Sequence, residues 1–338
     1  MQRVILTALR SALRPPHRLH ATYERLLGTE VEVQVVARTA EQAHAAEHAA
    51  LTEIERLTRI FNRFDPESEL RRWQARPGDT HVPLSLELLQ VLRLADHWRA
   101  HSGGAFHAGA DALAQLWQQA AAADTLPSPD ALARQVSALR AAPWTLHADG
   151  SATLHASGPL GLNALAKGYI VDRAAQVASR HAGVRSVLIN AGGDLRVIGP
   201  ARVEVLIADP FTAQDDAPPV ARIGVREAAL ATSGQAHRGF QVQGRHYSHV
   251  LDPRTGQPVQ EVPGVTVTAP ECVTADALAT VLSVLEPRAG LNLLSSLPDC
   301  EAMIVTADGQ RHVSPGWTGV PLPRRTVRPS RRPLLTAR

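Results

Sequence analysis

The chain has 338 residues, of which 44% are hydrophobic and 20% are charged, and its formal net charge is +3 at pH 7. This length and composition allow a large buried core, which excludes a wholly disordered protein and leaves open one large domain or two joined lobes. Two cysteines, Cys272 and Cys300, cannot form a disulfide framework and lack the paired spacing of a zinc site.

The two ends of the chain differ from the rest in composition. The apolar stretch over 4–9 is interrupted by Arg10 and followed by Pro15-Pro16, so it is too short for a membrane span and poor as a signal sequence. Much of the basic excess lies over 324–338, which favours a solvated tail over contact with an anionic surface. We therefore predict a leader over 1–21, a folded region over 22–320, a disordered basic tail over 321–338, no integral membrane segment and a cytoplasmic location.

In the first half of the chain, the pattern of apolar residues indicates one strand and several helices. Thr29 to Ala37 alternates valine with polar residues, which is typical of a half-buried strand. Thr39 to Phe61 repeats apolar residues at three- and four-residue steps, which indicates a long amphipathic helix. A loop is expected next, because Asp65-Pro66 favours a turn. Further expected elements are a helix capped by Ser85 and running through Trp98, a helix over Asp130 to Arg140, and a hairpin over Trp144 to His155.

The second half of the chain is richer in expected strands. Helices are predicted over Ala166 to His181 and over Thr274 to Leu285. Strands are predicted over 186–194, 203–210, 222–225, 239–242, 264–269 and 302–306. Because this order mixes helices with hairpins and does not repeat a βαβ unit, the fold class is expected to be α+β with largely antiparallel sheets.

A candidate metal site lies in the segment VTADALATVL, which contains Asp276 and Thr280. Four residues apart on a helix, their side chains lie on one face, so a carboxylate and a hydroxyl can converge. Oxygen ligands of this kind suit Mg²⁺, which keeps waters and substrate phosphates as its other ligands. The alternative is that Asp276 only complements a helix dipole.

Lys167 and several glycine-rich turns are candidates for binding a phosphorylated ligand. Lys167-Gly168 is expected at the start of a helix, where backbone N–H groups attract anions and a lysine adds positive charge, although a surface lysine is the alternative. The spacing is not that of a P-loop. The turns NAGGD, TSGQ and SGGAF allow backbone to approach a ligand, but for any one of them an ordinary turn is the favoured interpretation, and only their number suggests a ligand.

His249, in YSHVLDPRTGQPV, is a candidate general base because the pKa of histidine lies near neutrality. The alternative is that it only braces the turn at Asp252-Pro253. The chain has no GxSxG, HExxH or CxxC motif, so a hydrolase triad, a zinc protease and a redox dithiol have no local support. No helix-turn-helix, zinc-finger or aromatic-plus-basic pattern suggests nucleic acid as a partner.

Taken in order along the chain, many of these segments resemble the successive blocks of the ApbE family of FAD:protein FMN transferases. The resemblance extends from about Leu26 to about Trp317. The blocks are LLGTEVEVQV, FNRFDPESEL, SGGAF, ALAKGYIVD, LINAGGDLRVIG, IADP, LATSG, YSHVLDPRTG and VTVTAPECVTADALATVL.

The resemblance implies a two-lobed fold related to the T-fold, with FAD in the cleft and Mg²⁺ on its pyrophosphate. It implies cleavage of FAD and transfer of FMN through a phosphoester bond to a threonine or serine of an acceptor protein, with release of AMP. The family marks its acceptors with a D-x-x-[ST]-G-A-[ST] motif. This chain lacks the motif, so modification of itself is not expected.

The resemblance also implies roles for individual residues. It assigns the metal to the side chains of Asp276 and Thr280 and the backbone carbonyl of Ala164. His249 matches the family histidine that assists proton removal from the acceptor hydroxyl. The implied flavin contacts are Leu27, Phe64, Ala105, Phe106, His107, Lys167 and Val250.

Two blocks depart from the family pattern. The family usually has an acid where this chain has His107, and an acid in the block before the lysine, where this chain has Gly161 and Asn163. The loss of two carboxylates near the flavin leaves two other functions open. One is Mg²⁺-dependent hydrolysis of FAD to FMN and AMP, and the other is FAD binding without turnover.

Overall fold

The computed structural model describes residues 15–78, 81–212, 217–234 and 239–322. Most of the predicted leader and nearly all of the predicted basic tail therefore lie outside the described residues. The first strand begins at His17, which is inside the predicted leader. Among the described residues, no helix is long and apolar enough to cross a membrane.

The described helices and strands alternate irregularly along the chain. The helices are α2 (Ala40–Phe61), α3 (Glu69–Gln74), α4 (Leu86–His101), α5 (Ala110–Ala122), α6 (Pro129–Ala138), α7 (Asn163–Ser179), α8 (Cys272–Val284) and α9 (Pro287–Leu294). The strands are β1 (His17–Leu26), β2 (Thr29–Ala37), β3 (Val82–Pro83), β4 (Trp144–Leu146), β5 (Ser151–Leu154), β6 (Val184–Ala191), β7 (Asp194–Ile198), β8 (Val203–Ile207), β9 (Ala221–Val225), β10 (Ala229–Gly234), β11 (Gly239–Val242), β12 (Arg245–Ser248), β13 (Gly264–Ala269), β14 (Glu301–Val305), β15 (Arg311–Val313) and β16 (Val320–Pro321).

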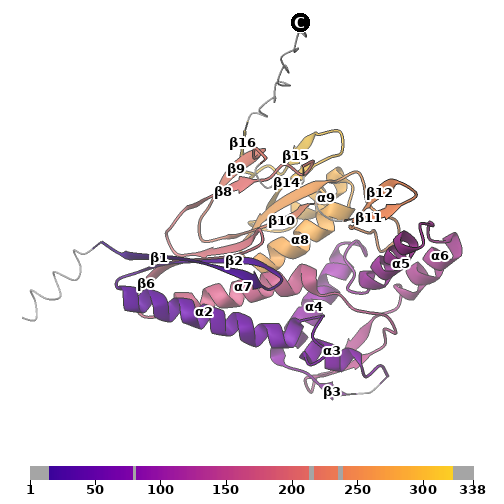
Figure 1. The fold of residues 1–338 in the computed structure, drawn as a ribbon, viewed down its shortest axis with the longest axis horizontal. Coiled ribbons are helices and arrows are strands. Elements are labelled where there is room, and N and C mark those ends of the chain that lie inside the picture. The colour runs from indigo at the N-terminus through magenta and orange to yellow at the C-terminus, as the bar shows by residue number, and fades with distance from the viewer. Residues whose placement is uncertain (1–14, 79–80, 213–216, 235–238, 323–338) are drawn as a thin grey trace, which may run out of the picture.

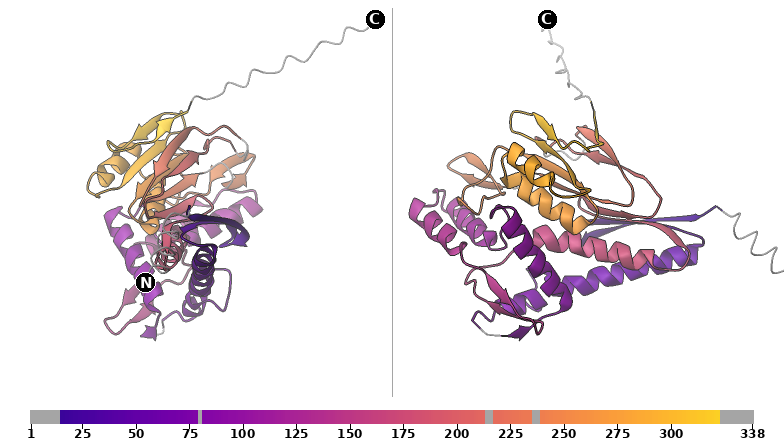
Figure 2. Two further views of the ribbon diagram at one scale, coloured as in Figure 1. Left: turned by 90° about the vertical axis from the view of Figure 1, so that its left-hand side faces the viewer. Right: turned by 180° about the vertical axis from the view of Figure 1, so that it is seen from behind.

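An eight-stranded sheet in the order β1-β2-β6-β7-β10-β13-β14-β15 forms the centre of the molecule. Every neighbouring pair of its described strands is antiparallel. Helices α2, α7 and α8 lie against one face of this sheet, and α2 and α7 run side by side (Figures 1 and 2). The layer between sheet and helices is the larger hydrophobic core, as expected when one apolar face of a sheet is covered by amphipathic helices.

The opposite face of the same sheet carries a second core. Alternation along β10 shows the division, because Ala229 and Ala231 belong to the helix side while Leu230 points to the other side. A three-stranded sheet, β16-β9-β8, covers Leu230 together with Leu195 and Met303. The central sheet is therefore sandwiched between helices and a small sheet.

Helices α5 and α6 form a separate apolar cluster with the β11–β12 hairpin. Trp117 of α5 lies at its centre, packs against Phe240 and donates a hydrogen bond from Nε1 to the Gly256 carbonyl at 2.9 Å. This contact joins α5 to the loop that follows His249. Another small sheet, β3-β5-β4, lies near α3, where Trp73 and Trp144 pack together.

The α+β class and the antiparallel sheets predicted from the sequence are confirmed. The predicted strand over Thr29–Ala37 is β2, and the long amphipathic helix is α2, whose N-cap Thr39 accepts a hydrogen bond from the backbone N–H of Gln42. Ser85 caps α4 as expected, and the predicted hairpin is β4–β5. Local chemistry determines these elements, so the sequence pattern was sufficient to predict them.

Several boundaries differ from the prediction. The single strand expected over 186–194 is two strands, β6 and β7, because Gly192 and Gly193 adopt positive φ angles of 59° and 97° and reverse the chain. The strand expected over 203–210 ends at Ile207. Helix α7 begins at Asn163 and not at Ala166, so Lys167-Gly168 lies in the second turn. The expectation that this lysine stands at the start of the helix is therefore wrong, and Ala164 occupies the first turn.

Several elements were not expected at all, namely β1, α3, β3, α5, β10, β12, α9, β15 and β16. In strand β1, Leu19, Ala21 and Tyr23 alternate with polar residues and pack on the core side, but the segment overlaps the predicted leader and was not assigned as a strand. Helix α5 begins after Gly109, which among the described residues makes no side-chain capping hydrogen bond, so the usual start signal is missing.

Candidate functional site

One large cleft, with a volume of about 1820 Å³, contains every residue that the sequence singled out for metal, flavin or proton transfer. Its walls come from α7, α8, the β6–β7 turn, the loop after β12, the segment before α5 and the loop after α2. The predicted residues in its lining are Leu27, Phe64, Ala105, Phe106, His107, Ala164, Lys167, His249, Val250, Asp276 and Thr280. The fold therefore brings them together, and their individual roles remain predictions.

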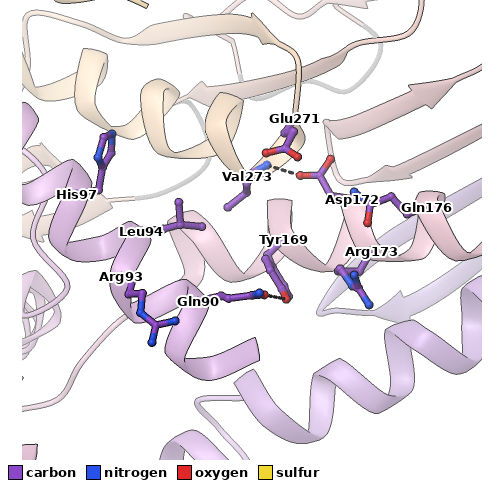
Figure 3. A pocket seen from close by; sticks show the side chains of 10 residues that line it. All are labelled: Gln90, Arg93, Leu94, His97, Tyr169, Asp172, Arg173, Gln176, Glu271 and Val273. Atoms are coloured by element: carbon purple, nitrogen blue, oxygen red, sulfur yellow. Dashed lines mark hydrogen bonds between the residues drawn. The ribbon is translucent and has the colours of Figure 1, made fainter. Parts of the chain in front are cut away.

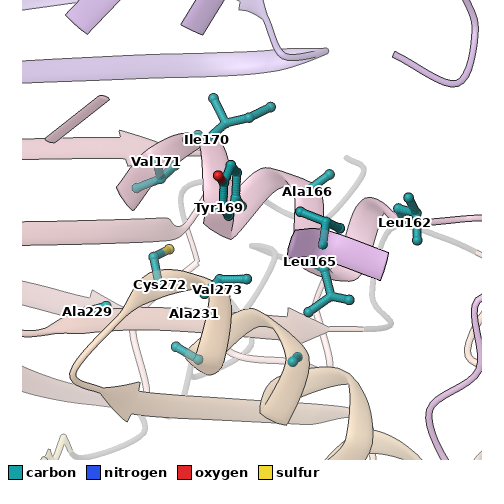
Figure 4. Packing of buried hydrophobic residues seen from close by; sticks show 14 of the residues in the cluster. Leu162, Leu165, Ala166, Tyr169, Ile170, Val171, Ala229, Ala231, Cys272 and Val273 are labelled. Carbon is teal, nitrogen blue, oxygen red and sulfur yellow. The ribbon is translucent and has the colours of Figure 1, made fainter. Parts of the chain in front are cut away.

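The centre of the cleft wall is the crossing of α7 over α8, and Gly168 sets how closely the two helices approach. A Cβ atom at this position would lie 2.6 Å from the Cys272 carbonyl oxygen and 2.7 Å from the Val273 Cα. Both neighbours are backbone atoms, so any larger residue would push α8 away. Residues of α7, α8 and β10 pack around this crossing into one buried cluster (Figure 4).

Asp172, one turn after Gly168, fixes the start of α8. Its two carboxylate oxygens accept hydrogen bonds from the backbone N–H groups of Cys272 at 2.8 Å and Val273 at 2.9 Å. Figure 3 shows the bond to Val273. Among the described residues, Glu271, the N-cap of α8, makes no side-chain capping bond. Asp172 therefore caps α8 from a neighbouring helix, which satisfies two N–H groups that would otherwise be left without partners.

The surroundings of Asp172 raise its pKa to about 6. Burial is the main cause, and the two backbone N–H groups and the nearby guanidinium of Arg196 oppose it. Asp172 also lines a second, smaller cavity of about 570 Å³ between α4 and α7 (Figure 3). This cavity contains none of the residues that the sequence singled out.

Lys167, Asp194 and Asp276 form the charged centre of the cleft. The Lys167 ammonium pairs with the Asp194 carboxylate, which is 2% exposed, and Asp276 Oδ2 accepts a hydrogen bond from the Gly168 N–H at 3.2 Å. Burial lowers the pKa of Lys167, but the charges of Asp194 and Asp276 outweigh it and raise the pKa overall. Burial and the negative charge of Asp194 raise the pKa of Asp276 well above its usual value. A cation bound near Asp276 would stabilise its ionised carboxylate and so oppose the rise in its pKa.

The donor set around Asp276 fits a hard cation. It comprises the Asp276 carboxylate, the Thr280 hydroxyl one turn later on the same face, and the Ala164 carbonyl from the first turn of α7, all lining one cleft. Among the described residues, no group of three or more His, Cys, Asp or Glu side chains could hold a metal. Mixed oxygen donors with few carboxylates suit Mg²⁺, which completes its shell with water and phosphate.

His249 also lines the cleft, on the loop after β12, and it is half-buried. The loop is held on both sides of it. Ser248 Oγ accepts a hydrogen bond from the Val250 N–H at 2.9 Å, and Gly256 N–H donates to the Asp252 carbonyl at 2.7 Å. The turn at Asp252-Pro253 is thus stabilised by its own backbone, and His249 faces the same space as Lys167 and Asp276.

A second charged pair lies elsewhere in the lining of the same cleft. Arg63, on the loop after α2, pairs with Asp111 of α5 through Nη1 and Oδ2 at 2.6 Å. Burial raises the pKa of Asp111, while Arg63 opposes the shift. The Arg63 guanidinium also lies 5.1 Å from the ring centre of Phe64, whose side chain is 81% exposed.

Comparisons with known proteins identify the family. The family model described as ApbE family matches residues 27–304. The chain belongs to the ApbE family. An FAD:protein FMN transferase of Treponema pallidum is 31% identical over 327 residues, which cover 88% of this chain and 88% of the relative. One from Vibrio cholerae is 30% identical and covers 76% of this chain and 79% of the relative.

Solved structures agree with this assignment to the ApbE family. The ApbE protein of Thermotoga maritima superposes with a TM-score of 0.75 at 26% identity, covering 89% of this chain and 97% of that one. The flavinyl transferase ApbE of Pseudomonas stutzeri gives a TM-score of 0.71 at 23% identity, covering 90% and 96%, and shows the same fold.

The structure accounts for the two departures from the ApbE pattern. His107 cannot supply the missing negative charge, because an imidazole is either neutral or positive, and burial and the positive charge of Arg99 lower its pKa to about 4, so it is neutral at pH 7. Its Nδ1 accepts a hydrogen bond from the Gly109 N–H at 2.9 Å. At Gly161 a carboxylate is present after all, because the Asp111 side chain fills the space that a Cβ of residue 161 would occupy.

Several charged residues of the cleft were missed as site residues, among them Arg63, Asp111 and Asp194. Asp194 belongs to the quoted NAGGD turn, so the signal was present, but its pairing with Lys167 depends on how β7 packs beside α7. Asp111 gave no signal, because an acid in the first turn of a helix is ordinary.

Proposed function

We propose that this chain cleaves FAD and transfers FMN to a serine or threonine hydroxyl of an acceptor protein, with AMP as the leaving group and Mg²⁺ as the required metal. Membership of the ApbE family and the relatives' names support the transferase activity. The observation that carries the metal assignment is the convergence of Asp276, Thr280 and Ala164 beside Lys167 in one cleft.

Different residues of the cleft have different roles in the proposed phosphoryl transfer. The acceptor oxygen forms a bond to the phosphorus of the FMN half, and the bond from that phosphorus to the AMP oxygen breaks. Lys167 places a positive charge close to this phosphate, and His249 accepts the proton that the acceptor hydroxyl loses. Bound Mg²⁺ would neutralise charge on the pyrophosphate, and Asp276, Thr280 and Ala164 would hold it.

Asp194 keeps Lys167 in position. Because Asp194 is almost fully buried and pairs with the ammonium group, the lysine is held at the cleft wall by a partner that cannot reach solvent. A fixed charge costs little reorganisation when negative charge develops on a transferring phosphate. Positioning of this kind is the main contribution that proteins make to phosphoryl transfer.

Two other activities use the same cleft. If water replaces the acceptor hydroxyl, the chain hydrolyses FAD to FMN and AMP. If the cleft binds FAD without reaction, neither product forms. The cytoplasmic location predicted from the sequence and the identity of the acceptor are likewise proposals, and the family motif D-x-x-[ST]-G-A-[ST] is the guide to the acceptor.

One incubation separates the three activities. The purified chain is mixed with FAD, Mg²⁺ and a protein that carries the acceptor motif, and AMP, free FMN and flavin fluorescence on the denatured acceptor are measured. Transfer predicts AMP with fluorescent acceptor and little free FMN, and EDTA should abolish all three signals. Equal amounts of AMP and free FMN without labelled acceptor would establish hydrolysis, and no AMP would exclude both reactions that cleave FAD.

A further inference from the structure

The Arg63–Asp111 pair has features that an ordinary surface ion pair lacks. The Asp111 carboxylate is 23% exposed, lies in the wall of the FAD-sized cleft and is raised in pKa by burial. A half-buried pair retains more of its attraction than a solvated one, because less water screens it. The pair is also neutral overall, so it can share a cleft with a pyrophosphate without strong repulsion.

Gly161 is the residue that makes room for this carboxylate. A Cβ on Gly161 would lie 2.5 Å from both Cγ and Oδ1 of Asp111. The Gly161 N–H donates a hydrogen bond to the Ala108 carbonyl at 2.7 Å, which holds the loop before α7 against the segment before α5. The Asp111 carboxylate is therefore held beside Gly161. Gly161 lies three residues before Ala164, the predicted carbonyl ligand of the metal.

A simpler role for Asp111 is to complement the dipole of α5, because it lies in the first turn of that helix. A carboxylate with that role alone need not be buried in a cleft, pair with Arg63 or lie against Gly161. Asp130 fills the same helical position in α6 and is exposed to solvent. It therefore provides a control for the dipole effect.

We propose that Asp111, oriented by Arg63 and accommodated by Gly161, accepts a hydrogen bond from a donor on the flavin half of FAD. The donors of that half are the hydroxyls of the ribityl chain and the imide N–H of the ring. The exposed ring of Phe64, held beside Arg63, offers an apolar face to the planar ring system next to these donors. Asp111 would thus select the flavin end of the dinucleotide. The inference rests on the proposed function.

Binding of the two halves of FAD tests the proposal. Riboflavin affinity is measured by fluorescence quenching and AMP affinity by calorimetry, for the wild-type chain, Asp111→Asn and Asp130→Asn. Asp111→Asn should weaken riboflavin binding about tenfold, the loss expected for one hydrogen bond to a charged group. AMP binding should not change, and Asp130→Asn should match the wild type. Unchanged riboflavin affinity, or an equal loss for AMP, would overturn the proposal.

A double variant tests the role of Gly161. Asp111→Ala should bind riboflavin weakly, and Asp111→Ala with Gly161→Asp should recover most of the affinity, since the carboxylate returns to the same space from the facing loop. A folded double variant that binds no better than Asp111→Ala would contradict the proposal. Failure of the transferase function itself would look different, because the wild type would then bind riboflavin normally and yet leave the acceptor unmodified.

Discussion

The α7–α8 crossing and the Arg63–Asp111 pair line the same cleft but are built in different ways. At the crossing, three residues of the KGYxxD segment contact α8 or the charge beside it: Lys167 pairs with Asp194, Gly168 allows close approach, and Asp172 caps α8. The Arg63–Asp111 pair instead joins three segments that are far apart in the sequence. Short motifs therefore describe the first region well and the second hardly at all.

The difference has a chemical consequence. Residues at the crossing hold both the metal donors and the helix that carries them, so substitutions there should lower the turnover rate or the stability. Within the described part of the chain, Arg63 and Asp111 pair with each other and make no hydrogen bond or ion pair with the predicted metal donors or with α8. Substitutions there should lower substrate affinity and leave the turnover rate nearly intact.

The largest expected effect comes from the crossing itself. Asp276→Asn should reduce AMP release by at least about a hundredfold, because loss of a direct metal ligand should exceed the 10- to 100-fold cost typical of its outer-shell partners. Riboflavin affinity should remain, since the shape of the helix face is kept. Rates at saturating FAD and Mg²⁺ decide the matter, and a rate near that of the wild type would remove Asp276 from the metal site.

The next largest effect is expected at His249, which lines the same cleft as the crossing. His249→Ala should lower transfer to the acceptor by about a hundredfold or more, the usual contribution of a general base, while FAD still binds. Single-turnover transfer and flavin affinity are measured on the same preparation. If His249 only braces the turn at Asp252-Pro253, the variant will melt at a lower temperature and yet transfer FMN at a near-normal rate.

A smaller effect, on the free energy of unfolding, is expected at Gly168, which sets the spacing between α7 and α8. Gly168→Ala should cost about 1–3 kcal/mol of unfolding free energy, because the new methyl group meets backbone atoms of α8. Gly290→Ala in α9 is the control, since its methyl group would meet the far end of the Leu282 side chain and not backbone atoms. Urea unfolding of both variants gives the comparison. An equal loss in the two would mean that the crossing is not tightly packed at Gly168.

The smallest expected effect is a change in pH dependence. The pKa of Asp172 is raised to about 6 in the folded chain, so between about pH 4 and pH 6 the folded state binds more protons than the unfolded state. This group therefore makes stability fall as the pH rises through that window. Asp172→Asn cannot titrate and should flatten the slope in part, since Asp194 and Asp276 also have raised pKa values. An unchanged slope would show that Asp172 titrates normally.

Much of the fold could be predicted from the sequence because local chemistry determines it. Thr39 and Ser85 cap their helices through their own side chains, and the alternation of β2 follows from one buried face. Strand β1 and helix α5 could not be found in this way. Strand β1 alternates, but only Leu19 on it is fully buried and it overlaps the predicted leader, while the start of α5 relies on Gly109 and not on a capping side chain.

The candidate site was predictable only where its residues share a segment. Asp276 and Thr280 are an i, i+4 pair, and a helix brings such a pair together whatever the rest of the fold does. The pairing of Lys167 with Asp194 and the contact of Asp111 with Gly161 depend on packing between distant segments. A departure such as Gly161 looks like a lost carboxylate in the sequence, whereas the structure places another carboxylate in that space.

The most direct test of the proposed function is the intact mass of an acceptor protein after incubation with this chain, FAD and Mg²⁺. We predict that the acceptor gains the mass of one FMN less one water, and that the gain disappears with EDTA or when the motif hydroxyl is replaced by alanine. An acceptor of unchanged mass, in a reaction that nevertheless consumes FAD and releases FMN and AMP, would contradict the transferase function and establish a hydrolase in its place.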